Sequence, residues 1–202
     1  MYQTTLFEKE ESVYVNDYSI RRIERYEALP FILELHYAKR VPSAIQYTFG
    51  LFHTKKLVGI ITYGIPASNQ LCEGIAGIEN KKLVIELSRL ALRDNKQNEA
   101  SILIGASFKL LPKPLIIVSY ADTKQKHQGI VYQATNFLFT GTTSERTDAS
   151  AGDGKHSRHH LGDLTQRVVR SPKHRYVYIL GSKRDKKKLQ KQLKYKIQPY
   201  PK

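Results

Sequence analysis

Cysteine is almost absent from this chain of 202 residues, in which Cys72 stands alone. A single thiol excludes an internal disulfide and any zinc or CxxC site that needs two cysteines, and it suits a reducing compartment. These facts favour a small buried hydrophobic side chain over a nucleophilic thiol at this position.

Long apolar runs are also missing. No stretch approaches the ~20 residues that a membrane-spanning helix requires. Residues 1–17 contain acidic residues where a signal peptide is basic and then apolar. We therefore expect a cytoplasmic protein with no membrane partner, and the 41% apolar composition predicts one globular domain with a hydrophobic core.

Acidic residues are scarce only near the C-terminus. Residues 1–154 hold 18 Lys and Arg against 16 Asp and Glu, a charge of +2, whereas residues 155–202 hold 15 against 2, a charge of +13. Basic residues interleaved with Tyr195 and Tyr200 suit the phosphate backbone of nucleic acid. The alternative is a solvated tail kept for solubility. The candidate DNA-binding cations are Lys183, Arg184, Lys186, Lys187, Lys188, Lys191 and Lys194.

An anionic membrane is a weaker partner for this segment. Its apolar stripe of Leu189, Leu193 and Ile197 is narrow and has no Trp or Phe anchor. We therefore favour nucleic acid as its partner.

The chain has no internal repeat, and strand patterns alternate with helix patterns. We expect a loop at residues 74–80 and a flexible polar, His-rich loop at residues 142–174, where periodicity disappears. The expected strands are 18–23, 44–52, 56–64, 83–92, 115–120, a return strand ending near 141, and 176–180, and the expected helices are 24–39, 98–111, one after residue 122, and one within 183–196.

These elements divide the chain into an N-terminal arm (1–17), a core (18–141), the polar loop (142–174) and a final strand with a basic helix or tail (175–202), the last belonging to the same domain. The histidines of residues 155–160 have the composition of a metal site. We favour a loop that becomes ordered on nucleic acid over a metal site for these residues.

The order of elements resembles the GNAT acyltransferase fold, a mixed α/β (α+β) sheet that splays open between its fourth and fifth strands to admit acetyl-coenzyme A. The resemblance implies that residues 83–92 and 115–120 form the site. It also implies that Ser101 lies near the helix N-terminus that faces the pyrophosphate, where backbone N–H groups and the helix dipole favour anions. One departure is that residues 93–101 contain no glycine, although most acetyltransferases have a Gly-rich loop there.

Four strings carry a closer resemblance. They are LHYAKR at residues 35–40, ELSRLAL at 86–92, SYAD at 119–122 and HQGIVYQATNFLFTG at 127–141. In this order the set is similar to the Mom family of phage DNA-modification proteins, which are GNAT-like in fold. The resemblance covers residues 18–141, with the basic C-terminal region as a looser match. It implies a phage-infected or prophage-bearing cell.

The family resemblance implies that the chain places a carbamoylmethyl group on the exocyclic amine of adenine in double-stranded DNA, which protects phage DNA from restriction. In that product the adenine nitrogen is joined to a methyl carbon, whereas attack on a thioester would join it to the carbonyl carbon. Acetyl-CoA is the expected donor. A redox-active metal such as iron is one means of activating the methyl carbon, with oxygen and imidazole ligands.

The resemblance assigns His36, Tyr37 and Asp122 to catalysis and to that metal. The residues alone leave simpler alternatives open. His36 suits interaction with helix C-terminal carbonyls, Tyr37 suits an aromatic core position, and Asp122 suits the cap of a turn.

Two further positions match the site. Arg89 lies in an apolar strand, where its charge needs a partner such as Glu86, a coenzyme phosphate or the substrate. Tyr132 matches the position where acetyltransferases often place a tyrosine beside the thioester sulfur, so it is a candidate for both cofactor binding and catalysis. Packing is the alternative for Tyr132.

Two other functions stay open. One is an ordinary GNAT acetyltransferase acting on a protein, a tRNA or a small amine, against which the missing Gly-rich loop counts. The other is a non-catalytic nucleic-acid-binding module. A homodimer is also left open.

Overall fold

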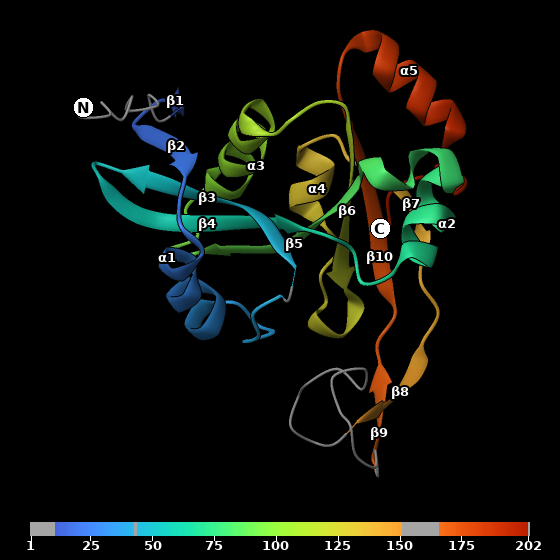
Figure 1. Cartoon of the computed structure of the whole chain (residues 1–202). Coiled ribbons are helices and arrows are strands. Elements are labelled where there is room, and N and C mark those ends of the chain that lie inside the picture. Colours follow the sequence, from blue (N-terminus) through green and yellow to red (C-terminus); the bar gives the residue numbers. More distant parts are fainter. Residues whose placement is uncertain (1–10, 43, 151–165, 202) are drawn as a thin grey trace, which may run out of the picture.

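The chain folds around one large sheet. The computed structural model describes residues 11–42, 44–150 and 166–201. Its eight-stranded sheet has the order β1-β2-β3-β4-β5-β6-β10-β7, and every neighbouring pair is antiparallel except β5 and β6 (Figure 1). The strands are β1 (Ser12–Val15), β2 (Tyr18–Arg22), β3 (Ile45–His53), β4 (Lys56–Gly64), β5 (Val84–Leu92), β6 (Leu115–Asp122), β7 (Leu138–Thr142) and β10 (Lys173–Leu180).

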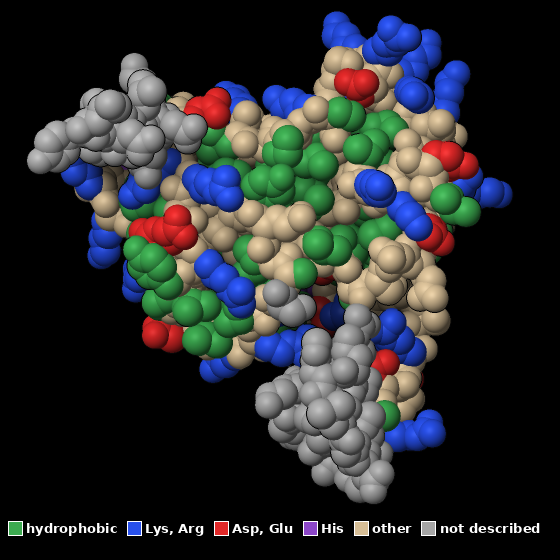
Figure 2. Space-filling model, in the orientation of Figure 1, with side chains coloured by type: hydrophobic (Ala, Val, Ile, Leu, Met, Phe, Trp, Pro, Cys, Tyr) green, Lys and Arg blue, Asp and Glu red, His purple; other side chains and the backbone are tan. Residues whose placement is uncertain are grey.

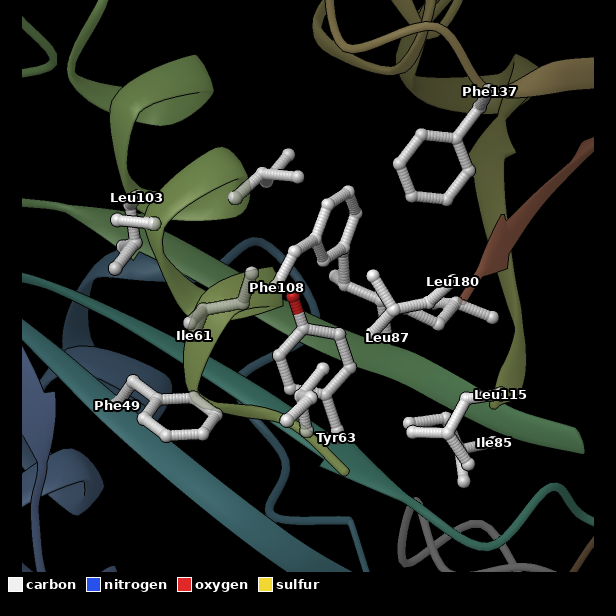
Figure 3. Close-up of a cluster of buried hydrophobic side chains, with 14 of the residues drawn as sticks. Phe49, Ile61, Tyr63, Ile85, Leu87, Leu103, Phe108, Leu115, Phe137 and Leu180 are labelled. Atoms are coloured by element: carbon white, nitrogen blue, oxygen red, sulfur yellow. The ribbon is translucent and has the colours of Figure 1, made fainter. Parts of the chain in front are cut away.

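Helices cover both faces of this sheet. Alternating side chains of one strand belong to different cores, as Ile116 packs with one cluster and Ile117 with another. The helices α3 (Glu99–Leu110) and α4 (Ile130–Ala134) lie on the face of the largest core, part of which Figure 3 shows. The opposite face carries α1 (Arg25–Pro30) with the π-helical segment η1 (Phe31–Leu35), and also α2 (Asn69–Asn80) and α5 (Lys183–Gln192).

The largest core forms because the apolar faces of β3 to β6 meet α3. Phe49, Tyr63, Leu103 and Phe137 are at most 2% exposed. The Tyr63 hydroxyl, which points toward α3 in Figure 3, forms a hydrogen bond of 2.7 Å with Ser107 Oγ. Each buried aromatic side chain contributes about 1.5–3 kcal/mol of hydrophobic stabilisation. The predicted hairpin of β3 and β4 is confirmed, with His53 opposite Lys56.

Three predictions about elements were wrong, and one strand was missed. Residues 74–80 complete helix α2, with a kink at Gly77, rather than forming a loop, because Cys72, Ile75 and Ala76 pack against the sheet and outweigh the low helix propensity of the glycines. The expected helix at 24–39 ends at Leu35, where η1 stops and His36 turns extended. Strand β1 was not predicted. Part of the expected polar loop forms a two-stranded ribbon of β8 (Arg146–Ser150) and β9 (Gln166–Arg170).

The two parallel strands separate after a short pairing. Strands β5 and β6 pair only through Val84–Glu86 and Ile116–Val118. Beyond this point β5 continues beside β4, and β6 continues beside β10. The sheet is therefore splayed at the carboxyl ends of β5 and β6. Because β1 adds a strand at the start, these are the fifth and sixth strands rather than the fourth and fifth.

In the described residues, no helix has both the length and the apolar character needed to cross a membrane. The histidine-rich residues 155–160 lie outside the described part of the chain.

Candidate functional site

A cleft of about 680 Å³ opens where β5 and β6 separate. It is lined by the end of η1, most of β5, the end of β6, the loop before α4, and α4 itself. Both predicted site-forming strands therefore contribute to it. Of the predicted site residues, His36, Tyr37, Arg89 and Tyr132 line the cleft.

His36 and Tyr37 follow η1 and lie side by side. Their rings stack with centroids 4.5 Å apart, and the Tyr37 and His127 rings form a T-shaped pair with centroids 5.5 Å apart. Burial, together with the smaller effect of the charges of Arg89 and His127, lowers the pKa of His36 to about 4. His36 Nδ1 accepts a hydrogen bond of 3.1 Å from the Ala38 N–H. The imidazole is therefore neutral at pH 7.

This shift in the pKa of His36 predicts that acid lowers the stability of the folded protein. His36 has an ordinary pKa of 6.5 and a folded pKa of about 4, so the unfolded chain binds a proton more readily than the folded chain between these values. Stability should fall as pH decreases from about 6.5 towards 4. His36→Gln should lack this contribution, which urea unfolding of both proteins across that range will measure. Parallel stability curves would contradict the prediction.

Arg89 fixes the segment that carries His36 and Tyr37. Its Nε and Nη2 donate to the Arg40 carbonyl at 3.1 and 2.8 Å, and its Nη1 donates to the Ser88 carbonyl at 2.5 Å. The expected partners were Glu86, a coenzyme phosphate or the substrate. The structure instead pairs Arg89 with backbone carbonyls, so it holds residues 36–40 against β5.

Asp122 lies at the end of β6 and is 8% exposed. Its carboxylate accepts hydrogen bonds from Ser171 Oγ at 2.6 Å and the Lys124 N–H at 3.0 Å, and it forms an ion pair with Lys173. Burial alone would raise the pKa of Asp122, but the hydrogen bonds from Lys173 and Ser171 outweigh it and lower the pKa. The bond from Lys124 caps the following turn, which is the simpler role left open by the sequence.

Tyr132 lies on α4 between aromatic neighbours. Its ring is 5.2 Å from Tyr176 and 5.3 Å from Phe137. Burial raises the pKa of Tyr132 to about 12, against a smaller lowering by a hydrogen bond with Ser119. Its hydroxyl stays protonated at neutral pH and can donate a hydrogen bond into the cleft.

The N-terminus of α3 differs from the expected phosphate site. Ser101 Oγ donates to the Asn98 carbonyl at 2.9 Å, and Ala100 rather than Ser101 lines the cleft. The buried Glu99 carboxylate accepts hydrogen bonds from the Lys96 N–H at 2.9 Å and the Tyr18 hydroxyl at 3.0 Å. This helix end thus carries a carboxylate of the chain itself near the position where acetyltransferases bind phosphate.

Comparison with known proteins decides the family. The model of the Mom protein family matches residues 17–202. The chain belongs to the Mom protein family. The methylcarbamoylase Mom of Escherichia phage Mu is 25% identical over 207 residues, which cover 91% of this chain and 83% of that protein.

Solved structures show the fold of this Mom-family chain. A probable acetyltransferase from Staphylococcus epidermidis superimposes with a TM-score of 0.50 and 11% identity, covering 80% of this chain and 98% of the other. The acetyltransferase NAA60 of Arabidopsis thaliana, solved in complex with acetyl-CoA, has a TM-score of 0.48 and 14% identity, covering 81% and 98%. The GNAT-like fold is confirmed, and the Mom-family chain is a transferase.

The site residues of this Mom-family chain do not fit the expected iron site. His36 and Tyr37 lie together in the cleft, but the Asp122 carboxylate is held by Lys173, Ser171 and Lys124 and does not line the cleft. Across residues 11–42, 44–150 and 166–201 there is no cluster of three or more His, Cys, Asp or Glu suited to a metal. We therefore derive no step through iron.

Glu86 is a cleft residue that the sequence analysis considered only as a partner for Arg89. Burial raises the pKa of Glu86 to about 7, and the charges of Arg89 and Lys173 lower it in part. The sequence feature that could have marked Glu86 as a site residue is its charge within the largely apolar run 84–92. Its place at the last residue paired with β6 was not visible in the sequence.

Basic side chains of the Mom-family chain gather at two ends of the sheet. Helix α5 follows Leu180, which pairs with Leu115 at the amino end of β6, and its Lys and Arg side chains are at the top of Figure 2. The β8–β9 ribbon lies beyond the opposite end of β10, where Lys173 pairs with Asp122 (Figure 1). The cleft opens at the ribbon end, not at the α5 end.

The two tyrosines of the basic segment contact the protein itself. The Arg175 guanidinium stacks on the Tyr195 ring at 3.3 Å, and the Tyr200 hydroxyl donates to the Phe137 carbonyl at 2.8 Å. The other candidate contacts of this segment are its cations. Six of the seven predicted cations are exposed on or beside α5, namely Lys183, Arg184, Lys187, Lys188, Lys191 and Lys194.

Proposed function

We propose that the chain transfers a carbamoylmethyl group to the exocyclic amine of adenine in double-stranded DNA and so protects that DNA from restriction. The observation that carries this proposal is the match of residues 17–202 to the Mom family, together with the splayed cleft that this match covers. The methylcarbamoylase named among its relatives performs a transfer of this kind.

The cleft suits a base that has left the duplex. Adenine inside a double helix is shielded by its neighbours, so an enzyme must extrude it to reach its amine. The volume of about 680 Å³ accommodates a purine, and the Tyr37 ring, 46% exposed, offers a surface on which a base can stack. Tyr120 lines the same cleft from β6.

Cations near the cleft support a DNA partner. Lys124 and Lys126 lie on the exposed loop beside the cleft, and Arg146 and Arg167 lie exposed on the β8–β9 ribbon. A two-stranded ribbon fits the major groove of DNA. We propose that these residues hold the duplex next to the extruded adenine, and that the α5 cations add phosphate contacts farther along.

An acyl-CoA is the donor class that the shared acetyltransferase fold supports. Its pantetheine arm would lie between β5 and β6, with the Tyr132 hydroxyl available to hydrogen-bond the sulfur. The carboxylate of Glu99 disfavours a diphosphate directly on the α3 N-terminus, so we assign the phosphates to the neighbouring Lys96 and Arg93 instead. A thioester brings a two-carbon unit into the cleft, but it activates the carbonyl carbon, so bonding the methyl carbon to adenine requires a further activation step.

Restriction digestion tests the proposal in cells. Plasmid DNA from cells that express the protein should resist enzymes whose recognition sites contain the modified adenine, because an added group blocks their contacts in the major groove. DNA from cells with an empty vector is the control. Complete digestion of both plasmids would favour an ordinary acetyltransferase or a binding module.

Matched charge variants test the two DNA contacts. Replacing Lys124, Lys126, Arg146 and Arg167 with Gln removes four charges near the cleft, and replacing Lys183, Lys187, Lys188 and Lys191 removes four from α5. Both variants should bind DNA more weakly. The slope of log binding constant against log salt concentration should become shallower by about 0.9 for each lost phosphate contact. Only the first should also slow modification at saturating DNA. An unchanged slope would exclude the altered region from DNA contact.

A further inference from the structure

An exposed leucine borders the cleft. Leu35 is the last residue of η1, is 42% exposed and lines the cleft, directly before His36 and Tyr37. Apolar side chains gather over α1 and η1 on the face that Figure 2 shows. Leu33, two residues earlier, is exposed to a similar degree, 45%, but is not one of the residues that line the cleft. Leu35 therefore presents apolar surface to a ligand that enters the cleft.

Backbone hydrogen bonds fix the segment that carries Leu35. The His36 N–H donates to the Phe31 carbonyl at 3.1 Å, and the Lys39 N–H donates to the His36 carbonyl at 2.9 Å. Arg89 holds the end of the same segment against β5 through two hydrogen bonds to one backbone carbonyl. A side chain on a segment held in this way can enter a stack of bases without displacement of its own backbone.

Cations lie on both sides of this apolar surface. Lys39 and Arg40 follow Tyr37 in the same segment and are exposed. Lys124 and Lys126 are exposed on the other loop beside the cleft. A DNA duplex has the complementary arrangement, because its phosphates flank a stack of apolar base faces. The charges around the cleft therefore favour contact between this surface and the base stack of a duplex.

We propose that Leu35 is a wedge that fills the gap left in the base stack when the acceptor base enters the cleft. This inference rests on the proposed function, in which that base is an adenine extruded from the duplex. Extrusion costs the base its pairing and stacking. Proteins that open a base step frequently insert an apolar side chain between the neighbouring bases. Leu35 restores apolar contact to those neighbours, while Tyr37 offers its ring to the extruded base.

Leu35→Ala tests the inference, because it removes the wedge and leaves the polar groups of the cleft in place. In a cell lysate that supplies the donor, modification of duplex plasmid DNA should fall about tenfold or more. The variant and the wild type should modify single-stranded circular DNA of the same sequence equally, because its bases are not paired. Leu33→Ala is the matched control and should keep duplex modification within about twofold.

Two further readouts separate a wedge from a structural residue. Leu35→Met should retain most of the duplex modification, because methionine is apolar and fills a similar volume. The melting temperature of Leu35→Ala should stay within about 2 °C of the wild type, since the side chain is exposed. Equal losses on duplex and single-stranded DNA, or an equal loss in Leu33→Ala, would overturn the inference.

Permanganate oxidation of plasmid DNA measures base extrusion without any donor. Permanganate attacks the thymine that an extruded adenine leaves unpaired, and sequencing locates it. Purified wild type and Leu33→Ala should create reactive thymines, and Leu35→Ala should lower their reactivity about tenfold. Reactive thymines that depend on Leu35, without any modified adenine, would keep the wedge and remove the proposed transfer. Reactivity that is equal in wild type and Leu35→Ala, or absent from both, would remove Leu35 from extrusion.

Discussion

Asp122→Ala should abolish DNA modification, with a loss of at least about 100-fold, while the chain stays folded. Asp122 holds Lys173 and Ser171 at the base of the ribbon, and it caps the turn that begins the loop beside the cleft. Without the carboxylate, Lys173 is left without its ion-pair partner and the loop from residue 123 to 128 loses an anchor. A displacement of about 1 Å at a reacting centre is enough for such a loss.

The series Asp122→Asn and Asp122→Ala tests this positioning role. Asparagine retains an oxygen for Ser171 and Lys124 and loses only the charge, so it should keep more activity than alanine. Hydrogen exchange should show faster opening of residues 123–128 in the alanine variant than in the wild type. Full modification by Asp122→Ala would remove Asp122 from the site.

Gly129→Ala should have the largest effect on stability. Gly129 precedes α4 with φ of 73°, and a Cβ built there lies 2.4 Å from Cε2 of Tyr176, which is fully buried. Left-handed strain and overpacking together should cost about 2–5 kcal/mol. Because α4 carries Tyr132, activity should fall as well. Urea unfolding measures the loss.

Gly105→Ala is the control for that variant. Gly105 lies in α3, is exposed, and a Cβ there meets nothing within 4 Å. The same substitution should stabilise the protein by about 0.5–1 kcal/mol, because alanine favours the helix. Equal stability changes at both positions would contradict the account of Gly129.

Periodicity predicted most of the sheet. Strands β3 to β6 are buried and rich in branched apolar residues, so their pattern was clear before their pairing was known. Helix α2 was missed because Gly74 and Gly77 weaken its local signal, and the packing that stabilises it comes from β5, β6 and α5. The β8–β9 ribbon was missed because its strands are polar and pair only with one another.

The candidate site was predictable only in part. Of the residues that the family strings assign to the site, His36, Tyr37, Arg89 and Tyr132 line one cleft, whereas Asp122 does not. The partners of Asp122 come from residues 171 and 173, almost fifty positions away, and no local pattern indicates them. The place of Glu86 at the last residue of β5 that pairs with β6 is likewise a property of the folded chain.

The most direct test of the proposed function is mass spectrometry of nucleosides from the DNA of cells that express the wild type or Asp122→Ala at equal levels. It detects the product without assuming a donor. The account predicts an adenosine species heavier by one carbamoylmethyl group in wild-type DNA and its loss in the variant. Only unmodified nucleosides in both samples, with soluble protein present, would contradict it.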